Sequence, residues 1–86
     1  MEVVVKLLNE EGMHARPAGI LVKRVGMFQS KIELQYNGKT ANAKSLLSIM
    51  GLGLTANAEF TIKAEGIDAE LALTSLSEMV QSKFKL

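Results

Sequence analysis

The chain contains no cysteine, one histidine, one proline and few aromatic side chains. Without cysteine it can form neither a disulfide bond nor a thiolate metal site. A single histidine without clustered carboxylates offers too few ligands for a closed metal site, so we expect no metal and no cofactor. The missing disulfides fit a reducing compartment, and we expect a cytoplasmic protein.

The sequence also lacks a strong charge of either sign and any long apolar run. Its formal net charge is +1, and its basic residues are scattered without interleaved aromatic residues, which argues against nucleic acid as a partner. No apolar run approaches the ~20 residues of a membrane span, and the first residues lack the segments of a signal peptide, so we expect no membrane insertion. We find no nucleotide loop and no catalytic triad, and therefore do not expect an enzyme. The length predicts a single domain over residues 1–86.

Four segments have the composition or alternation of strands: Glu2 to Leu8, Lys31 to Tyr36, Lys39 to Ala43 and Glu59 to Ala64. The first is β-branched and apolar almost throughout, which predicts a strand with at least partial cover on both faces. Asn37-Gly38 separates the second segment from the third. It is a strong hairpin signal because a type I′ turn needs positive φ at both of its central positions.

Three helical segments complete the pattern. Pro17 fits the first turn of a helix, and apolar residues follow it at helical spacing: Ala18, Leu21, Val22, Val25 and Phe28. Ser45 is expected to cap a short segment, Leu46 to Leu52. Asp68 is expected to cap the last helix, whose apolar stripe comprises Ala69, Ala72, Leu73, Leu76, Met79 and Val80.

Near the end of that helix, Lys83 and Lys85 are expected to complement its negative dipole end. The order of all the segments is βαββαβα, with mostly hairpin-like connections between the strands. This order predicts an α+β fold in which a four-stranded antiparallel sheet carries its helices on one face.

The only histidine, His14, lies in the run GMHARPA, residues 12–18, where a loop leads into the first helix. An imidazole is a nucleophile near neutral pH. Arg16 offers a planar fork of donors suited to phosphate oxygens, and the first helical turn leaves backbone N–H groups unpaired. A lone histidine at a helix start is more often a simple surface residue. In this context the sequence instead predicts a histidine that carries a phosphoryl group, which Arg16 stabilises.

Two runs carry a family resemblance, GMHARPA at residues 12–18 and NAKSLLSIMGLG at residues 42–53. The first resembles the phosphohistidine motif of HPr, the phosphocarrier family of the bacterial phosphoenolpyruvate-dependent sugar phosphotransferase system (PTS). The second is similar to the regulatory-serine segment of that family. Their separation and the hairpin between them also match, so the resemblance covers essentially the whole chain. It implies the HPr-like open-faced β-sandwich, with three helices on one side of the sheet.

The resemblance also implies a function. HPr proteins accept a phosphoryl group from phosphorylated enzyme I and pass it to the IIA components of sugar permeases. The carrier position corresponds to His14, with the phosphoryl group on Nδ1, and the supporting arginine corresponds to Arg16. The regulatory serine corresponds to Ser45, which implies two further partners, an HPr kinase/phosphorylase and a catabolite-repression transcription factor. The retained histidine distinguishes the chain from the Crh-like branch.

The segment after Ser45 has more apolar residues than a short helix can bury on one face. Either all of them pack inward, or Leu46, Leu47 and Met50 form an exposed docking patch near His14. In the second case Lys23 and Arg24, together with Arg16, would supply a basic rim for the patch.

The chain departs from the commoner family pattern at three positions: Ser48 where glycine is usual, Gly51 where serine is usual, and Gly19 where alanine or threonine is usual. None of them touches the carrier motif, but they leave the partners of the Ser45 segment open. Two other functions remain as alternatives. One is a regulatory binding module in which His14 is vestigial, and the other is a carrier in a nitrogen-linked or dihydroxyacetone-linked phosphotransferase chain.

Overall fold

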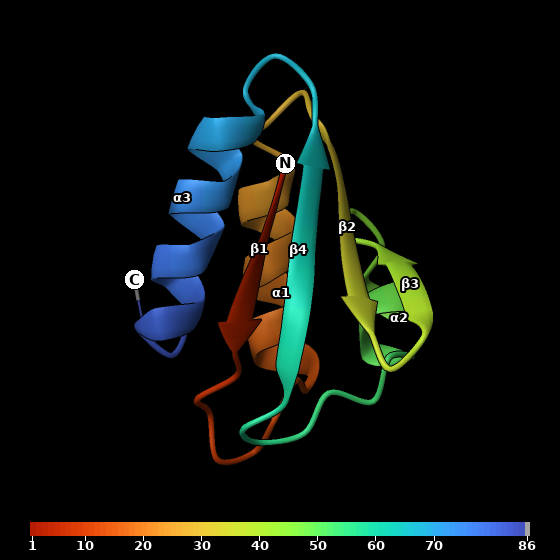
Figure 1. Ribbon diagram of the computed structural model, residues 1–86. Coiled ribbons are helices and arrows are strands. Elements are labelled where there is room, and N and C mark those ends of the chain that lie inside the picture. The colour runs from red at the N-terminus through yellow and green to blue at the C-terminus, as the bar shows by residue number, and fades with distance from the viewer. Residues whose placement is uncertain (86) are drawn as a thin grey trace.

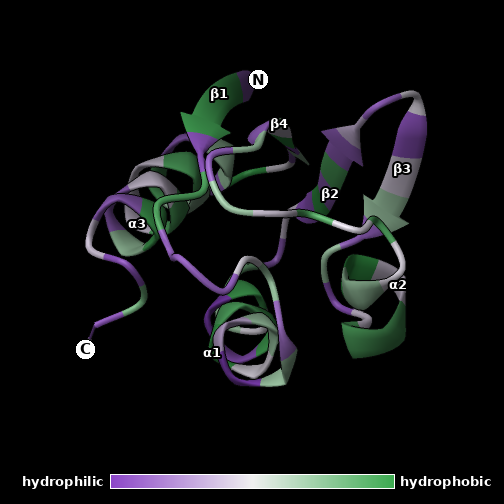
Figure 2. Ribbon diagram, turned by 90° about the horizontal axis from the view of Figure 1, so that it is seen from below, coloured by the Kyte–Doolittle hydropathy of each residue, from purple (hydrophilic) through white to green (hydrophobic). Residues whose placement is uncertain are grey.

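The structure, a computed structural model, describes residues 1–85. Its elements in chain order are β1 (Glu2–Lys6), α1 (Ala15–Val25), β2 (Lys31–Tyr36), β3 (Lys39–Asn42), α2 (Leu46–Met50), β4 (Glu59–Glu65) and α3 (Ala69–Gln81). The strands form one antiparallel sheet in the order β1-β4-β2-β3. All three helices lie on one side of this sheet (Figures 1 and 2). The predicted α+β architecture, an open-faced β-sandwich, is confirmed.

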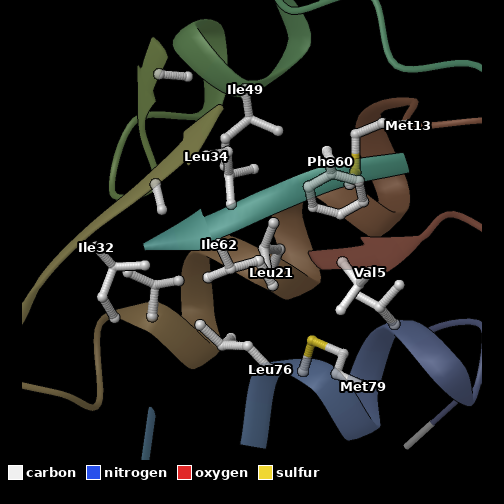
Figure 3. Packing of buried hydrophobic residues seen from close by; sticks show 14 of the residues in the cluster. Val5, Met13, Leu21, Ile32, Leu34, Ile49, Phe60, Ile62, Leu76 and Met79 are labelled. Atoms are coloured by element: carbon white, nitrogen blue, oxygen red, sulfur yellow. The ribbon is translucent and has the colours of Figure 1, made fainter. Parts of the chain in front are cut away.

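The core lies between the sheet and the helices. The central strand β4 turns Phe60, Ile62 and Ala64 inward, each at most 1% exposed, and α1 and α3 cover them with Leu21 and Leu76 (Figure 3). Burying a large apolar side chain of this kind contributes roughly 1.5–3 kcal/mol relative to leaving it in water. The first helix is therefore fixed against the sheet, and the loop that precedes it starts from a rigid base.

The outer face of the sheet is open, and this corrects the expectation for Glu2 to Leu8. Val4 is 60% exposed, whereas Val5 is buried, so the first strand is covered on one face only. Its β-branched composition favours a strand whether or not both faces are buried. Oppositely charged residues face each other across the outer surface, and such cross-strand pairs support the sheet. They are Glu2 and Lys63, Lys6 and Glu59, Lys31 and Glu65, and Glu33 and Lys63.

The local signals for the hairpin turn and for the two helix caps are confirmed in position, and one cap differs in its hydrogen bonds. Asn37 and Gly38 have φ angles of 52° and 81°, as the type I′ prediction requires. Ser45 caps α2, since its Oγ accepts a hydrogen bond from the Ser48 N–H at 3.2 Å. Asp68 is the N-cap residue of α3, as predicted, but its side chain makes no capping hydrogen bond to the helix. Its carboxylate instead accepts hydrogen bonds from the loop between α1 and β2.

Several boundaries differ by a few residues from those expected. α1 begins at Ala15, so that Pro17 lies in its first turn as predicted, and α2 ends at Met50, where Gly51 forms the C-cap. β1 ends at Lys6, although the next residue, Leu7, still exchanges hydrogen bonds with residues 57 and 58. Across residues 1–85, no helix combines the length and the apolar character needed to cross a lipid bilayer.

Candidate functional site: a histidine at the start of the first helix

His14 is the N-cap residue of α1. Its backbone is extended, with φ −105° and ψ −173°, and its carbonyl oxygen accepts the Ala18 N–H at 3.0 Å. Its imidazole makes no capping hydrogen bond and is 38% exposed. The ring is therefore accessible to a reactant. The N–H groups of Ala15 and Arg16 remain available to an anion, because the first turn of a helix offers them no intrahelical acceptor, and Pro17 has no N–H.

The loop before His14 is held in place by its backbone. The Met13 N–H donates to the Leu54 carbonyl oxygen at 3.0 Å, and the Met13 side chain is only 7% exposed, within the core cluster labelled in Figure 3. Gly12 takes a left-handed conformation with φ 73°. A β-carbon there would lie 2.7 Å from the same carbonyl oxygen, so the site needs glycine at this position.

Glu11 contacts the histidine ring directly. Its Oε2 lies 2.9 Å from Nε2 of His14, which is hydrogen-bonding distance. The other ring nitrogen, Nδ1, takes no part in this contact. Glu11 was not predictable as a site residue, because a carboxylate three residues before a histidine has no fixed geometry until Gly12 turns the chain.

A shallow polar hollow surrounds the ring. It measures about 290 Å³ and is lined by Asn9, Glu10, Glu11, His14, Arg16, Lys83 and Lys85. Arg16 is exposed, so its guanidinium can reach a ligand in the hollow. Oδ1 of Asn9 is buried, with no hydrogen-bond partner among residues 1–85. The hollow thus brings together the predicted pair, His14 and Arg16, and adds two lysines from the other end of the chain.

The two lysines reach the hollow because the chain folds back after α3. Lys83 and Phe84 both have left-handed backbones, with φ 59° and 62°. Phe84 is 1% exposed, and its N–H donates to the Met79 carbonyl oxygen at 2.9 Å. The buried ring anchors the segment and leaves Lys83 and Lys85 at the hollow. The sequence predicted these lysines at the negative end of the α3 dipole and did not predict that they reach the hollow. The available signal was Phe84, an apolar residue between two lysines.

The second motif forms an exposed apolar patch. Leu46 is 40% exposed, Leu47 83% and Met50 40%, whereas Ile49 and Leu52 are buried. Of the two alternatives, full burial is wrong and the exposed surface is present. α2 packs beside α1 (Figure 2), and the loop after α2 carries the Leu54 carbonyl that holds Met13. The patch is therefore joined through the backbone to the loop that presents His14.

The structure places the two predicted rim residues of α1, Lys23 and Arg24, in one hollow with Met79 of α3. Lys23 is exposed, but the Arg24 guanidinium donates through Nη1 to the Ser75 hydroxyl of α3 at 2.9 Å. α3 and α2 lie on opposite sides of α1 (Figure 2), so the structure does not bring Arg24 to the apolar patch. No group of three or more potential metal ligands occurs among residues 1–85.

Comparison with known proteins assigns the family. A family model described as the PTS HPr component phosphorylation site matches residues 1–82. HPr-C-His from Thermoanaerobacter tengcongensis is 38% identical, with a TM-score of 0.94 over 100% of this chain and 99% of that one. Phosphocarrier protein HPr from Bacillus anthracis is 38% identical, with a TM-score of 0.90 over 94% and 96%. The catabolite-repression protein Crh from Bacillus subtilis, a domain-swapped dimer, is 35% identical, with a TM-score of 0.80 over 91% and 90%. The chain belongs to the HPr family of PTS phosphocarrier proteins.

Proposed function

We propose that this protein carries a phosphoryl group on Nδ1 of His14, accepting it from phosphorylated enzyme I and passing it to IIA components of sugar permeases. The observation that carries the proposal is the accessible imidazole at a helix N-terminus, in a hollow lined by Arg16, Lys83 and Lys85. A phosphoenolpyruvate-dependent relay of this kind operates in the cytoplasm, where we place the protein.

The proposed phosphoryl transfer requires the protein to position the reacting atoms and to supply positive charge. Phosphoryl transfer is catalysed mainly by alignment of the reacting atoms and by stabilisation of the equatorial oxygens. Arg16 and the N–H groups of the first turn supply fixed positive charge beside the ring. His14 needs no base, because a neutral imidazole attacks through its own lone pair and leaves with the same electrons.

The exposed patch of Leu46, Leu47 and Met50 supports a docking role beside His14. A carrier must fit donor and acceptor proteins in turn, and flexible methionine and leucine side chains suit such a reusable surface. Lys23 is exposed on the neighbouring helix and would contact acidic residues of those partners. Arg24 has a smaller part in this proposal, because its guanidinium is engaged by Ser75.

Ser45 is proposed as a regulatory phosphorylation site. Its hydroxyl caps α2 and directly precedes Leu46 and Leu47. A phosphate on it would place close to two negative charges beside the docking patch and weaken binding to an acidic partner surface. The proposed enzyme is an HPr kinase/phosphorylase, and the proposed reader of the modified form is a catabolite-repression transcription factor. The test is incubation with ATP and that kinase, and an acid-stable phosphate found only at another residue would end this part of the proposal.

The carrier function is tested by mixing the purified protein with phosphoenolpyruvate and enzyme I. We expect one acid-labile phosphoryl group per chain, detected by intact mass and mapped to His14. His14→Ala should accept none, whereas Ser45→Ala should be phosphorylated like the parent protein. A protein that stays unmodified while a known HPr in the same mixture is phosphorylated would instead favour a purely regulatory module. Transfer to a panel of IIA proteins then separates a sugar relay from a nitrogen-linked or dihydroxyacetone-linked one.

A further inference from the structure

Glu11 contacts the imidazole of His14 in the hollow. Oε2 of Glu11 is 2.9 Å from Nε2, and both side chains are partly exposed, at 78% and 38%. We propose that Glu11 is a positioning residue for phosphoryl transfer. Its carboxylate keeps the ring proton on Nε2, which leaves the lone pair of Nδ1 free to attack. The part concerning transfer rests on the proposed carrier function, whereas the part concerning the proton does not.

Glu11 contacts the imidazole at Nε2 and leaves Nδ1 without a contact from this carboxylate. A neutral imidazole has one N–H and one bare nitrogen, and a carboxylate accepts hydrogen bonds but donates none. With Glu11 at Nε2, the proton is favoured there and the nucleophilic nitrogen is Nδ1. An exposed pair of this kind adds little to stability, but a small preference is enough to choose between two tautomers.

The other charged groups around the ring do not duplicate this role. Glu10, Arg16, Lys83 and Lys85 line the same hollow. The three cations favour an anion near the ring but cannot accept its proton. Glu10 forms no ion pair with His14 in the part of the chain that the structure describes, so Glu11 is the carboxylate placed to hold the tautomer.

The proposed step balances without any exchange of protons. The Nδ1 lone pair forms a bond to phosphorus, and the bond from phosphorus to the donor breaks with its electron pair leaving on the donor. His14 then carries the phosphoryl group on Nδ1 and its original proton on Nε2, so the ring has gained one positive charge. In the transfer to the acceptor, the N–P electron pair returns to Nδ1 and the ring becomes neutral again.

Glu11 is therefore next to a charge that appears on phosphorylation and disappears on transfer. A fixed carboxylate beside this charge stabilises the phosphorylated ring and the transition state leading to it more than the neutral ring. The contact also favours one orientation of the imidazole, and so one direction of attack for Nδ1.

The proton on Nε2 is tested first, without any phosphoryl donor. Nitrogen-15 NMR of the ring at pH 8 gives the ratio of the Nε2–H to the Nδ1–H tautomer. We expect this ratio to fall about threefold in Glu11→Ala, in keeping with a surface pair. Glu10→Ala is the matched control, since it removes the same charge from the same hollow and should leave the ratio unchanged. An unchanged ratio in Glu11→Ala, or an equal fall in both variants, would overturn the proposal.

The rate of transfer is tested second, with Glu11→Gln. The amide oxygen can still accept the Nε2 proton, so this variant removes the negative charge but not the hydrogen-bond acceptor, and its tautomer ratio is measured alongside. We expect the single-turnover rate constant at saturating donor to fall about three- to tenfold relative to Glu10→Gln. An equal rate in the two variants would overturn the electrostatic part of the inference. If none of the proteins, including the parent, accepts a phosphoryl group, the carrier function fails and the tautomer result still decides the role of Glu11.

Discussion

The carbonyl oxygen of Leu54 occupies the space that a side chain on Gly12 would need. A β-carbon on Gly12 would lie 2.7 Å from that oxygen, and the backbone of Gly12 has φ 73°. The next residue, Met13, donates its N–H to the same oxygen at 3.0 Å. The contact between the loop before α1 and the loop after α2 fixes where α1 begins, and therefore fixes the position of His14.

Gly12→Ala should therefore destabilise the protein and disturb the site. We expect the free energy of unfolding to fall by about 2–3 kcal/mol, from the left-handed backbone and the close carbonyl together. The proposed phosphoryl acceptance by His14 should also slow, because the loop must shift to admit the methyl group. Urea unfolding and single-turnover transfer at low temperature measure the two effects separately.

Gly19→Ala is the matched control for that substitution. Gly19 lies within α1, and nothing is within 4 Å of the position of its β-carbon. Alanine there should raise the free energy of unfolding by about 0.5–1 kcal/mol, because it reduces the freedom of the unfolded chain. Equal losses of stability in the two variants would contradict the role assigned to the Gly12–Leu54 contact.

Local chemistry explains which parts of the site were predictable from the sequence. His14 and Arg16 belong to one helix start, so their proximity follows from their spacing alone. The Asn37-Gly38 turn and the alternation of β2 likewise depend on neighbouring residues. The family resemblance supplied the roles expected of His14 and Arg16, and these roles stay a prediction.

The features of the site and fold that were not predicted depend on long-range packing, which the spacing of residues in the sequence does not reveal. Lys83 and Lys85 reach the hollow only because Phe84 is buried and two residues take left-handed backbones. Asp68 has the residue type of a helix cap, yet its carboxylate is used by a loop 38 residues earlier in the chain, at Ser30. Val4 has the composition of a core residue but lies on the open face, because nothing in a strand pattern says that a sheet has a single layer of helices.

Met50→Asp should weaken docking and leave the fold intact. Met50 is 40% exposed at the end of α2, so a carboxylate there would be in water in the free protein and would lose that water in the proposed docked complex. We expect kcat/KM for phosphorylation by enzyme I to fall about tenfold or more, mainly through KM. The free energy of unfolding should change by less than about 0.5 kcal/mol.

Leu71→Asp provides the comparison for the docking patch. Leu71 is 65% exposed on α3, on the other side of α1 from α2 (Figure 2), so the same kind of change falls outside the patch. Its kcat/KM should stay close to that of the parent protein. Steady-state transfer assays would count against the patch if Met50→Asp were as active as Leu71→Asp.

The double variant Lys83→Gln/Lys85→Gln should slow the proposed phosphoryl transfer to and from His14. The two lysines and Arg16 line the hollow beside the ring, so removing two of these charges weakens the attraction for a phosphoryl dianion. We expect about a three- to tenfold lower rate at low salt, and a smaller loss at high salt because exposed charges are screened. The control is Lys6→Gln/Lys39→Gln, which changes the net charge equally at exposed positions outside the hollow. Identical rates and identical salt dependence in the two double variants would contradict a role for Lys83 and Lys85 in phosphoryl transfer.

Asp68→Asn tests a link that stabilises the fold away from the site. The Asp68 carboxylate accepts hydrogen bonds from the Ser30 hydroxyl and from the backbone N–H groups of Gln29 and Ser30, at 2.8 and 2.9 Å for the N–H groups. The Ser30 hydroxyl contributes most to lowering the pKa of Asp68 below its ordinary value of 3.8, and the Gln29 N–H comes next. A carboxyl whose pKa is lower in the folded state stabilises that state when it is ionised.

The sign of the pH dependence follows directly. The contribution of Asp68 is fully present above pH 3.8, the ordinary pKa of the side chain, and is lost as the pH falls through the lowered value in the folded protein. Asp68→Asn should therefore reduce the urea midpoint at pH 7, and the gap to the parent protein should narrow as the pH is lowered below 3.8. Paired urea titrations from pH 7 down to about pH 2.5, the range over which an aspartate titrates, measure this gap. A gap that stays constant over this range would show that the charge of Asp68 contributes nothing and that only the shape of its side chain matters.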